Sequence, residues 1–170
     1  MSKAATKGIY LMKVGITGHQ KRPGIDWKWV KRAIETKLAS FPAKIQGFSS
    51  LAEGTDQIFA DALLEAGGEL WAVIPTPDYL KHFEGPARGH FLALLEKAFH
   101  ITQLEPAASD EESFFAAGKC VVDFADVIIA VWDGKPAVGL GGTADVVAYA
   151  RQNGKAIHHI DPIAQEVRDI

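Results

Sequence analysis

The sequence of 170 residues contains a single cysteine, Cys120, which excludes an intramolecular disulfide. It has no apolar run near the roughly 20 residues that a membrane-spanning helix needs, so we expect no membrane contact. Charge of one sign does not dominate either, because the formal net charge is −3. That balance gives no general attraction to nucleic acid or to an anionic surface. No apolar signal segment is visible near the start, and we expect a cytoplasmic protein.

The sequence also has little that indicates metal or triad chemistry. Its His, Cys, Asp and Glu residues do not show metal-ligand spacing, and no Gly-x-Ser-x-Gly elbow occurs. The adjacent His158 and His159 fall in a strand-like run, where neighbouring side chains face opposite ways. One metal could not bind both, so we read them as structural. We predict no metal and no cofactor.

Strand-like and helix-like patterns alternate along the chain. Short apolar runs typical of buried strands occupy residues 11–17, 44–48, 70–74, 101–104, 127–132 and 156–160. Between them apolar residues recur at the helical period, with Asp26 and Ser109 as expected N-caps. Continuously apolar strands joined by helices predict a parallel sheet covered on both faces. We predict an α/β Rossmann-like three-layer sandwich of six to seven mostly parallel strands. Residues 1–170 would form one domain, with 1–10 as a flexible tail.

Two strand-to-helix turns are rich in small residues. One covers residues 49–56, Ser-Ser-Leu-Ala-Glu-Gly-Thr-Asp, and the other residues 139–143, Gly-Leu-Gly-Gly-Thr. The first N–H groups of a helix lack partners and lie at the positive end of the helix dipole, so they bind anions. Small side chains let a phosphate approach the backbone. Two such turns in one domain indicate a nucleotide or phosphosugar ligand.

Three loops, at residues 17–24, 49–55 and 133–142, should leave strands at the same edge of the sheet, where such folds bind ligands. Arg22 would clamp a phosphate, and Glu53 would accept hydrogen bonds from a ribose diol. Structural roles stay open beside these: a solvated loop for Arg22, an Asp-Gly turn for Asp133, a Ser50–Glu53 capping box and a helix cap at Thr143. The candidate ligand-binding residues are Gly18, His19, Arg22, Ser49, Ser50, Glu53, Gly54, Asp133, Gly141, Gly142 and Thr143.

Several motifs resemble a known superfamily. Residues 48–56 are similar to the Ser-Gly-Leu-Ala-x-Gly-Ile-Asp signature of the DNA-processing protein Smf/DprA, and 141–143 to the Gly-Gly-x-Gly-Thr turn of the Lonely Guy phosphoribohydrolases. The latter are often misannotated as lysine decarboxylases. Both belong to the SLOG superfamily, whose small stand-alone members carry an early Gly-x-Thr-Gly-His and a late Trp-Asp-Gly…Gly-Gly-Thr-Ala-Asp, matched by residues 15–19 and 132–145. The resemblance covers about Val14 to Asp161. It implies a Rossmann-like fold and a nucleotide or nucleotide-derived ligand.

The chain departs from the Lonely Guy pattern in two places, and one is the lead-in to the turn, which is Val138-Gly139-Leu140 in place of Pro-Gly-Gly. Those enzymes carry a Glu three residues after the Gly-Thr pair, where this chain has Val146. Asp145 is one residue early, and a helical step of one residue turns a side chain by about 100°. The missing Glu favours a sensor. In the alternative, a nucleoside 5′-monophosphate phosphoribohydrolase, Glu53 or Asp133 would supply the carboxylate that N-glycosidic cleavage needs.

A second alternative is single-stranded DNA binding, as in DprA. It needs a basic groove with stacking aromatic side chains, and the negative net charge argues against it. We expect a small-molecule nucleotide or phosphosugar as the partner, and nucleic acid as an unlikely one. The resemblance also implies a homodimer or a higher homo-oligomer.

Overall fold

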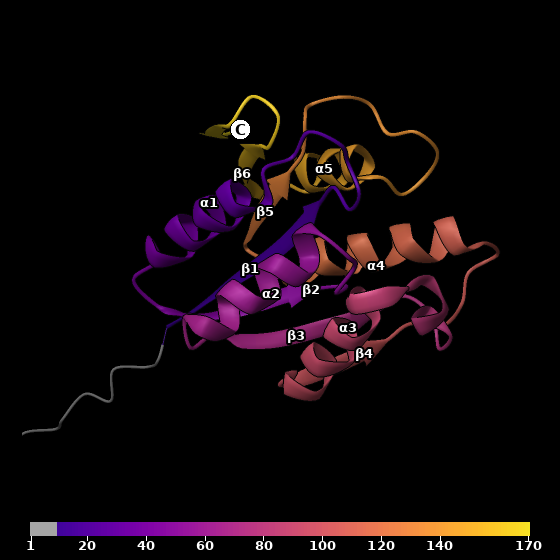
Figure 1. Cartoon of the computed structure of the whole chain (residues 1–170). Helices are drawn as coiled ribbons and strands as arrows, with labels where there is room; N and C mark the ends of the chain where they lie inside the picture. The colour runs from indigo at the N-terminus through magenta and orange to yellow at the C-terminus, as the bar shows by residue number, and fades with distance from the viewer. Residues whose placement is uncertain (1–9) are drawn as a thin grey trace, which may run out of the picture.

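A computed structural model describes residues 10–170, so the tail expected at residues 1–10 lies almost wholly outside the described residues. The strands are β1 Leu11–Gly18, β2 Lys44–Ser49, β3 Glu69–Ile74, β4 His100–Gln103, β5 Val127–Val131, β6 Ala156–Asp161 and β7 Glu166–Asp169 (Figure 1). The helices are α1 Trp27–Ala39, α2 Thr55–Glu65, α3 Gly85–Lys97, α4 Asp110–Phe124 and α5 Thr143–Gln152, with a short 3-10 helix, η1, at Tyr79–His82.

The seven strands form one sheet in the order β4-β3-β2-β1-β5-β6-β7. All neighbouring pairs are parallel except β6 and β7, which are antiparallel. The strand β1 lies between β2 and β5, so the two halves of the sheet diverge there. In an open sheet this change of direction leaves a crevice at the carboxyl ends of the strands.

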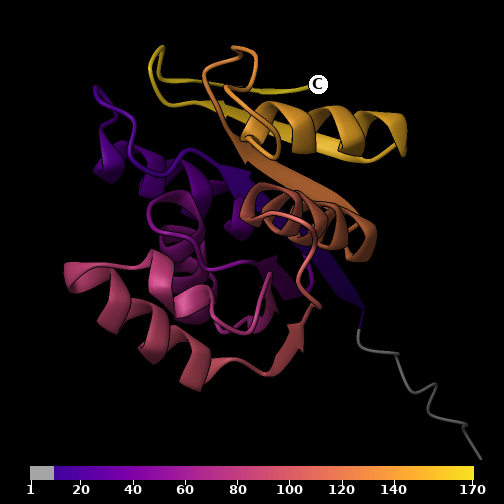
Figure 2. The same cartoon turned by 90° about the vertical axis from the view of Figure 1, so that its right-hand side faces the viewer.

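Helices cover both faces of the sheet, and each face has its own apolar core (Figure 2). On one face α1, α2 and α3 contribute buried residues such as Ile34, Phe59 and Leu94. On the other face α4 and α5 contribute residues such as Val121 and Val147. The predicted Rossmann-like three-layer sandwich is therefore confirmed.

The starts of α1 and α4 are fixed by the residues expected to cap them. The Asp26 carboxylate accepts hydrogen bonds from the N–H groups of Lys28 and Trp29, at 3.0 and 3.1 Å. Ser109 accepts from the Glu112 N–H at 3.2 Å, and the Glu112 carboxylate accepts from the N–H of Ala108 at 3.2 Å. These contacts satisfy N–H groups that a helix leaves unpaired.

The last strand, β7, was not among the six runs predicted from the sequence. All four of its residues are exposed, so it lacks the apolar signature of a buried strand. It is set by the turn before it, where the Asp161 carboxylate accepts from the N–H groups of Ile163 and Ala164, both at 2.9 Å. Across residues 10–170 no helix combines the length and the apolar character needed to cross a membrane.

Candidate functional site

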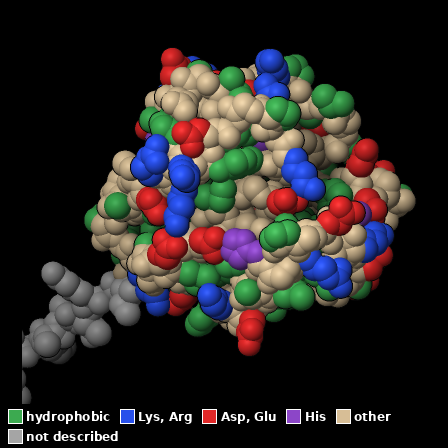
Figure 3. Space-filling view, in the orientation of Figure 1, with side chains coloured by type: hydrophobic (Ala, Val, Ile, Leu, Met, Phe, Trp, Pro, Cys, Tyr) green, Lys and Arg blue, Asp and Glu red, His purple; other side chains and the backbone are tan. Residues whose placement is uncertain are grey.

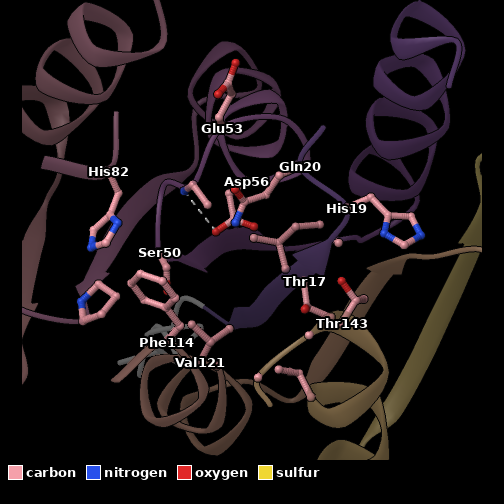
Figure 4. Close-up of a pocket in the computed structure, with 18 of the residues that line it drawn as sticks. Thr17, His19, Gln20, Ser50, Glu53, Asp56, His82, Phe114, Val121 and Thr143 are labelled. Carbon is pink, nitrogen blue, oxygen red and sulfur yellow. Dashed lines mark hydrogen bonds between the residues drawn. The ribbon is translucent and has the colours of Figure 1, made fainter. Parts of the chain in front are cut away.

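A cavity of about 420 Å³ opens at the carboxyl edge of the sheet, beside the end of β1. All three predicted loops contribute to its lining, together with the start of α5 and the segment around η1 and α4 (Figure 4). The lining residues that the sequence predicted are Gly18, His19, Ser50, Glu53, Gly141, Gly142 and Thr143. Those that lie outside the lining are Arg22, Ser49, Gly54 and Asp133.

The loops after β1 and β2 are held tightly together. Both the N–H and the hydroxyl of Thr55 donate to the His19 carbonyl, at 3.2 and 2.8 Å. Gly54 has a φ of +89°, and a Cβ at that position would lie 2.6 Å from the Gln20 carbonyl oxygen. Glycine is required there both for its conformation and for the close approach of the two loops.

Helix α2 therefore begins later than its sequence suggested. Its first residue is Thr55 and its N-cap is Gly54, so the expected Ser50–Glu53 capping box does not form. Because Gly54 takes a left-handed conformation, the loop continues past both residues before the helix starts. The N–H and the hydroxyl of Thr55 are already bonded to the His19 carbonyl. Little capacity to bind an anion is left at this helix start.

Helix α5, in contrast, presents an open start. Its N-cap is Gly142, which has no side chain that could cap the helix. Within the described residues, the N–H groups of Gly142, Thr143 and Ala144 make no hydrogen bond. The carboxylate of Asp145 accepts a hydrogen bond from the Gly141 N–H at 2.9 Å, which stabilises the turn before α5. Gly141, Gly142 and Thr143 face the cavity, and this geometry suits an anion.

Asp133 lies beside the cavity, in a charged cluster with Arg22 and His19. Its side chain is 7% exposed and contacts Arg22 at 2.8 Å and His19 Nε2 at 3.3 Å. Burial alone would raise the pKa of Asp133, but the Lys135 N–H and the charges of His19 and Arg22 outweigh it and lower the pKa. Both side chains proposed as ligand contacts, Arg22 and Asp133, are thus bound to each other beside the cavity.

His19 has two contacts that depend on where its proton resides. Its Nε2 lies 3.2 Å from the Asp133 backbone N and 3.3 Å from the carboxylate of the same residue. A neutral ring with a bare Nε2 accepts from the backbone N–H, whereas a protonated Nε2 donates to the carboxylate. In Figure 4 the His19 ring extends away from Asp56 and Ser50, so its backbone lies nearer to them.

Glu53 stands at the rim of the cavity. Its carboxylate is paired with Lys21 at 3.0 Å and is 37% exposed. In Figure 4 it points away from the other lining side chains. Among residues 10–170, none of those that line the cavity is a Lys or an Arg.

Asp56 differs from the other two acids, because its side chain lies in the middle of the lining residues (Figure 4). Only 8% of the residue is exposed, and its Oδ2 accepts from the Ala52 N–H at 3.4 Å. Burial raises the pKa of Asp56 to about 7, against the opposing hydrogen bonds from the Ala52 and Ser50 N–H groups and the Ser49 hydroxyl. The sequence indicated a loop anchor at Asp56, and the hydrogen bond from Ala52 gives it that role.

An aromatic wall closes the side of the cavity formed by η1 and α4. The ring centroid of Tyr79 lies 5.0 Å from that of Phe83 and 5.9 Å from that of Phe114, both edge-on. The centroids of His82 and Phe114 are 5.0 Å apart. Tyr79 and Phe83 are 6% exposed, so they pack as core residues and still border the cavity. Burial and the charge of Asp56 both raise the pKa of the Tyr79 hydroxyl.

The α4 side of this wall was not predicted from the sequence. Its α4 members, Phe114, Gly118 and Val121, follow helical spacing, which is also the pattern of any buried helix face. Among residues 10–170, no group of three His, Cys, Asp or Glu side chains is arranged to hold a metal.

Comparison with known proteins places the fold. No family model matches the chain, and no curated protein matches it in sequence. Solved structures do. TM1055 superposes with a TM-score of 0.52 and 17% identity over 86% of this chain and 72% of its own. The molybdenum cofactor binding protein of Rippkaea orientalis superposes with a TM-score of 0.56 and 17% identity, over 88% of this chain and 76% of its own. DNA processing protein A of Helicobacter pylori, which binds single-stranded DNA, superposes with a TM-score of 0.56 and 22% identity. The match covers 88% of this chain and 65% of its own.

The chain shares a Rossmann-like fold with these three proteins. At these identities the likeness concerns the fold, and it confirms the architecture that the sequence motifs implied. The chain spans about two thirds of the Helicobacter protein, so the activity of that longer protein does not carry over with the fold.

Proposed function

We propose that the protein binds a nucleotide or nucleotide-derived molecule in this cavity, as a sensor or a processor of it. The phosphate would lie on the start of α5, and the base would lie towards the aromatic wall. The observation that carries the proposal is the set of unpartnered N–H groups at Gly142 and Thr143, which border the cavity. Such groups bind phosphate without a cationic side chain, with the help of the helix dipole.

The cavity also has a size and a chemical character suited to such a ligand. A volume of about 420 Å³ lies within the range of small-molecule sites. The start of α5 offers N–H groups and the Thr143 hydroxyl, and Phe114 and His82 lie across from it in Figure 4, with Tyr79 packed against Phe114. Polar groups on one wall and aromatic groups on the other fit a molecule with a charged end and a flat end.

Sensing is favoured over cleavage by the position that would need a carboxylate. Val146 borders the cavity and is 4% exposed, while the neighbouring Asp145 is bonded to the Gly141 N–H. Val146 has no carboxyl group, and the carboxylate of Asp145 is engaged in the turn before α5. If the protein were an enzyme dependent on Glu53 or Asp133, then Glu53→Gln or Asp133→Asn would remove turnover with little loss of binding.

Thr143→Glu tests the phosphate site directly. A Glu in the first turn of a helix is compatible with the fold, because its negative charge interacts favourably with the helix dipole. Its carboxylate would occupy the anion site, and we expect nucleotide binding to weaken by on the order of 100-fold, since a like charge there costs several kcal/mol. The matched control is Ala148→Glu, an exposed position on the same helix, which should bind as the wild type does. Equal affinity of the two variants would refute the phosphate site.

A nucleotide panel comes first. It contains AMP, CMP, GMP, UMP, deoxynucleotides, NAD and ADP-ribose, with binding read by calorimetry and free-base release by chromatography. Binding without release supports a sensor, and release from one member identifies a glycosidase. Binding of no member overturns the nucleotide proposal. In that case the molybdenum cofactor, which the Rippkaea orientalis protein of this fold binds, becomes the next ligand to test.

A further inference from the structure

Four carboxyl groups lie in or next to the cavity, and among the described residues only that of Asp56 both lines it and lacks a charged partner. Asp145 lies outside the lining and is bonded to the Gly141 N–H. Asp133 is held by Arg22 and His19 outside the lining, and Glu53 is paired with Lys21 and points away. Asp56 borders the cavity and has no ion-pair partner among the described residues. We propose that Asp56 contacts the ligand and donates a hydrogen bond to it from the protonated carboxyl. The proposal rests on the proposed function, because it concerns the same cavity.

The surroundings of Asp56 favour a neutral carboxyl over a charged one. In the described part of the chain no Lys or Arg lines the cavity beside it, and a buried charge without a counter-ion is costly. The ionisable groups of the elements around the cavity are His19 after β1, Glu53 before α2, Tyr79 and His82 in η1, and Asp145 in α5. The part of α4 that lines the cavity, formed by Phe114, Gly118 and Val121, contributes none.

An incoming phosphate strengthens this preference. A dianion on the α5 start would repel an ionised Asp56 across the same small cavity, whereas a protonated Asp56 is uncharged and can donate. Burial already raises the pKa of Asp56 to about 7, so near neutral pH it holds its proton part of the time. The ligand that fits is a phosphorylated molecule with an oxygen or nitrogen acceptor, such as a sugar oxygen or a base carbonyl. Binding it above pH 7 then takes up one proton.

The proton uptake predicts a pH dependence of affinity. Between pH 7.5 and 9 the nucleotide phosphate and ordinary histidines have completed their titration. Over that range we expect the association constant of the wild type to fall about tenfold per pH unit, which corresponds to one proton. Asp56→Asn carries a permanent neutral donor, so its association constant should be flat and close to the wild-type value at pH 6.5.

The experiment is calorimetry at pH 6.5, 7.5, 8.25 and 9 with the nucleotide of the panel that binds most tightly. The proteins are the wild type, Asp56→Asn and Asp56→Leu, with Asp61→Asn as the matched control on the outer part of α2. Support requires a falling wild-type and Asp61→Asn profile, a flat Asp56→Asn profile, and weak binding by Asp56→Leu. Circular dichroism of each variant confirms the fold.

The outcomes separate the two proposals. If the panel has a binder but Asp56→Asn follows the wild-type profile, Asp56 does not contact the ligand, and the nucleotide site itself stands. A flat wild-type profile, or one that rises with pH, overturns the proton-donor role in the same way. Loss of binding in folded Asp56→Asn also refutes a neutral donor. If no nucleotide binds to the wild type, the proposed function and this inference fall together.

Discussion

At the scale of single residues, two aspartates of this site have opposite electrostatic surroundings. Asp133 is buried beside an arginine, a histidine and a backbone N–H, so its charged form is stabilised. Asp56 is buried beside uncharged groups, so its charged form is destabilised. Stability should therefore depend on these two carboxyls in different pH ranges, and each range can be measured.

For Asp56 the raised pKa means that the folded protein keeps a proton that the unfolded chain releases. The unfolded carboxyl has a pKa near 3.9 and the folded one about 7. Between these values stability falls as pH rises, by up to about 1.4 kcal/mol per pH unit, and it levels off above pH 7. Asp56→Asn lacks this loss. Urea unfolding at pH 4.5, 5.5, 6.5 and 8 should show the variant gaining on the wild type across that range. A constant difference at all four pH values would contradict a raised pKa.

For Asp133 the lowered pKa gives the reverse dependence. Its contribution is present at neutral pH and is lost below about pH 4, as the pH falls through the folded pKa. We expect Asp133→Asn to lower the free energy of unfolding by about 1–3 kcal/mol at pH 7, because Arg22 loses its partner. The difference from the wild type should shrink below pH 4. Glu53→Gln, which breaks an exposed pair with Lys21, is the control and should cost at most about 1 kcal/mol. Equal costs at pH 7 would show that burial of the Asp133 pair contributes nothing.

At the scale of elements, the site depends on two helix starts that have similar sequences and different environments. Both α2 and α5 follow glycine-containing turns, and the sequence favoured an anion at each. In the structure the α2 start is bonded to the His19 carbonyl, whereas the α5 start is open to the cavity. Such a difference is set by which loop packs against which, and this is tertiary information that local sequence does not contain.

Gly54 is the residue that allows the loops of β1 and α2 to meet. We expect Gly54→Ala to destabilise the protein by about 2 kcal/mol or more, because alanine is strained at a φ of +89° and its Cβ would clash with the Gln20 carbonyl. Gly67 is a matched control, since its φ is +78° and a Cβ there would meet no atom within 4 Å. Gly67→Ala should cost about 1 kcal/mol, from the strain alone. Urea denaturation of both variants measures the difference, and equal losses would mean that the close approach of the loops is unimportant.

Other elements show what the sequence could and could not predict. The caps at Asp26 and Ser109 were readable, because the capping side chain and the helix it caps are neighbours in sequence. The Ser50–Glu53 capping box rests on the same kind of local pattern, but it does not form. Gly54, in its left-handed conformation, moves the helix start to Thr55. The exposed β7 gave no apolar signal at all.

At the scale of the whole molecule, alternation of apolar strands and helices was sufficient to predict the layered fold. The order of the strands then brings the three predicted loops to one edge beside β1. Seven of the eleven predicted site residues line the cavity there, and the aromatic wall on the opposite side comes from η1 and α4. No sequence pattern distinguished Phe114 of that wall from an ordinary core residue. The homodimer implied by the resemblance stays a prediction, which light scattering of the purified protein would check.

The distribution of charge over the molecule argues against nucleic acid as a ligand. The net charge is −3, and acidic and basic side chains alternate on the face shown in Figure 3. Several lysines are already paired with acids, among them Lys31 with Glu65 and Lys81 with Asp78. A binding groove for single-stranded DNA needs a continuous row of cations that releases counter-ions along the strand. Such a row is missing from the cavity lining.

We therefore predict that a fluorescent 20-nucleotide oligo-dT shows no saturable change in anisotropy with up to 50 µM protein in 50 mM NaCl. Low salt is the most favourable condition for an electrostatic complex, because phosphate contacts weaken steeply as salt rises. A mononucleotide that binds under the same conditions would show that the cavity accepts one nucleotide unit and excludes a strand. Saturable oligonucleotide binding with a steep salt dependence would instead place the phosphates on an exposed surface. The basic side chains of α1, with Lys28 and Arg32 first among them, would then be the ones to replace.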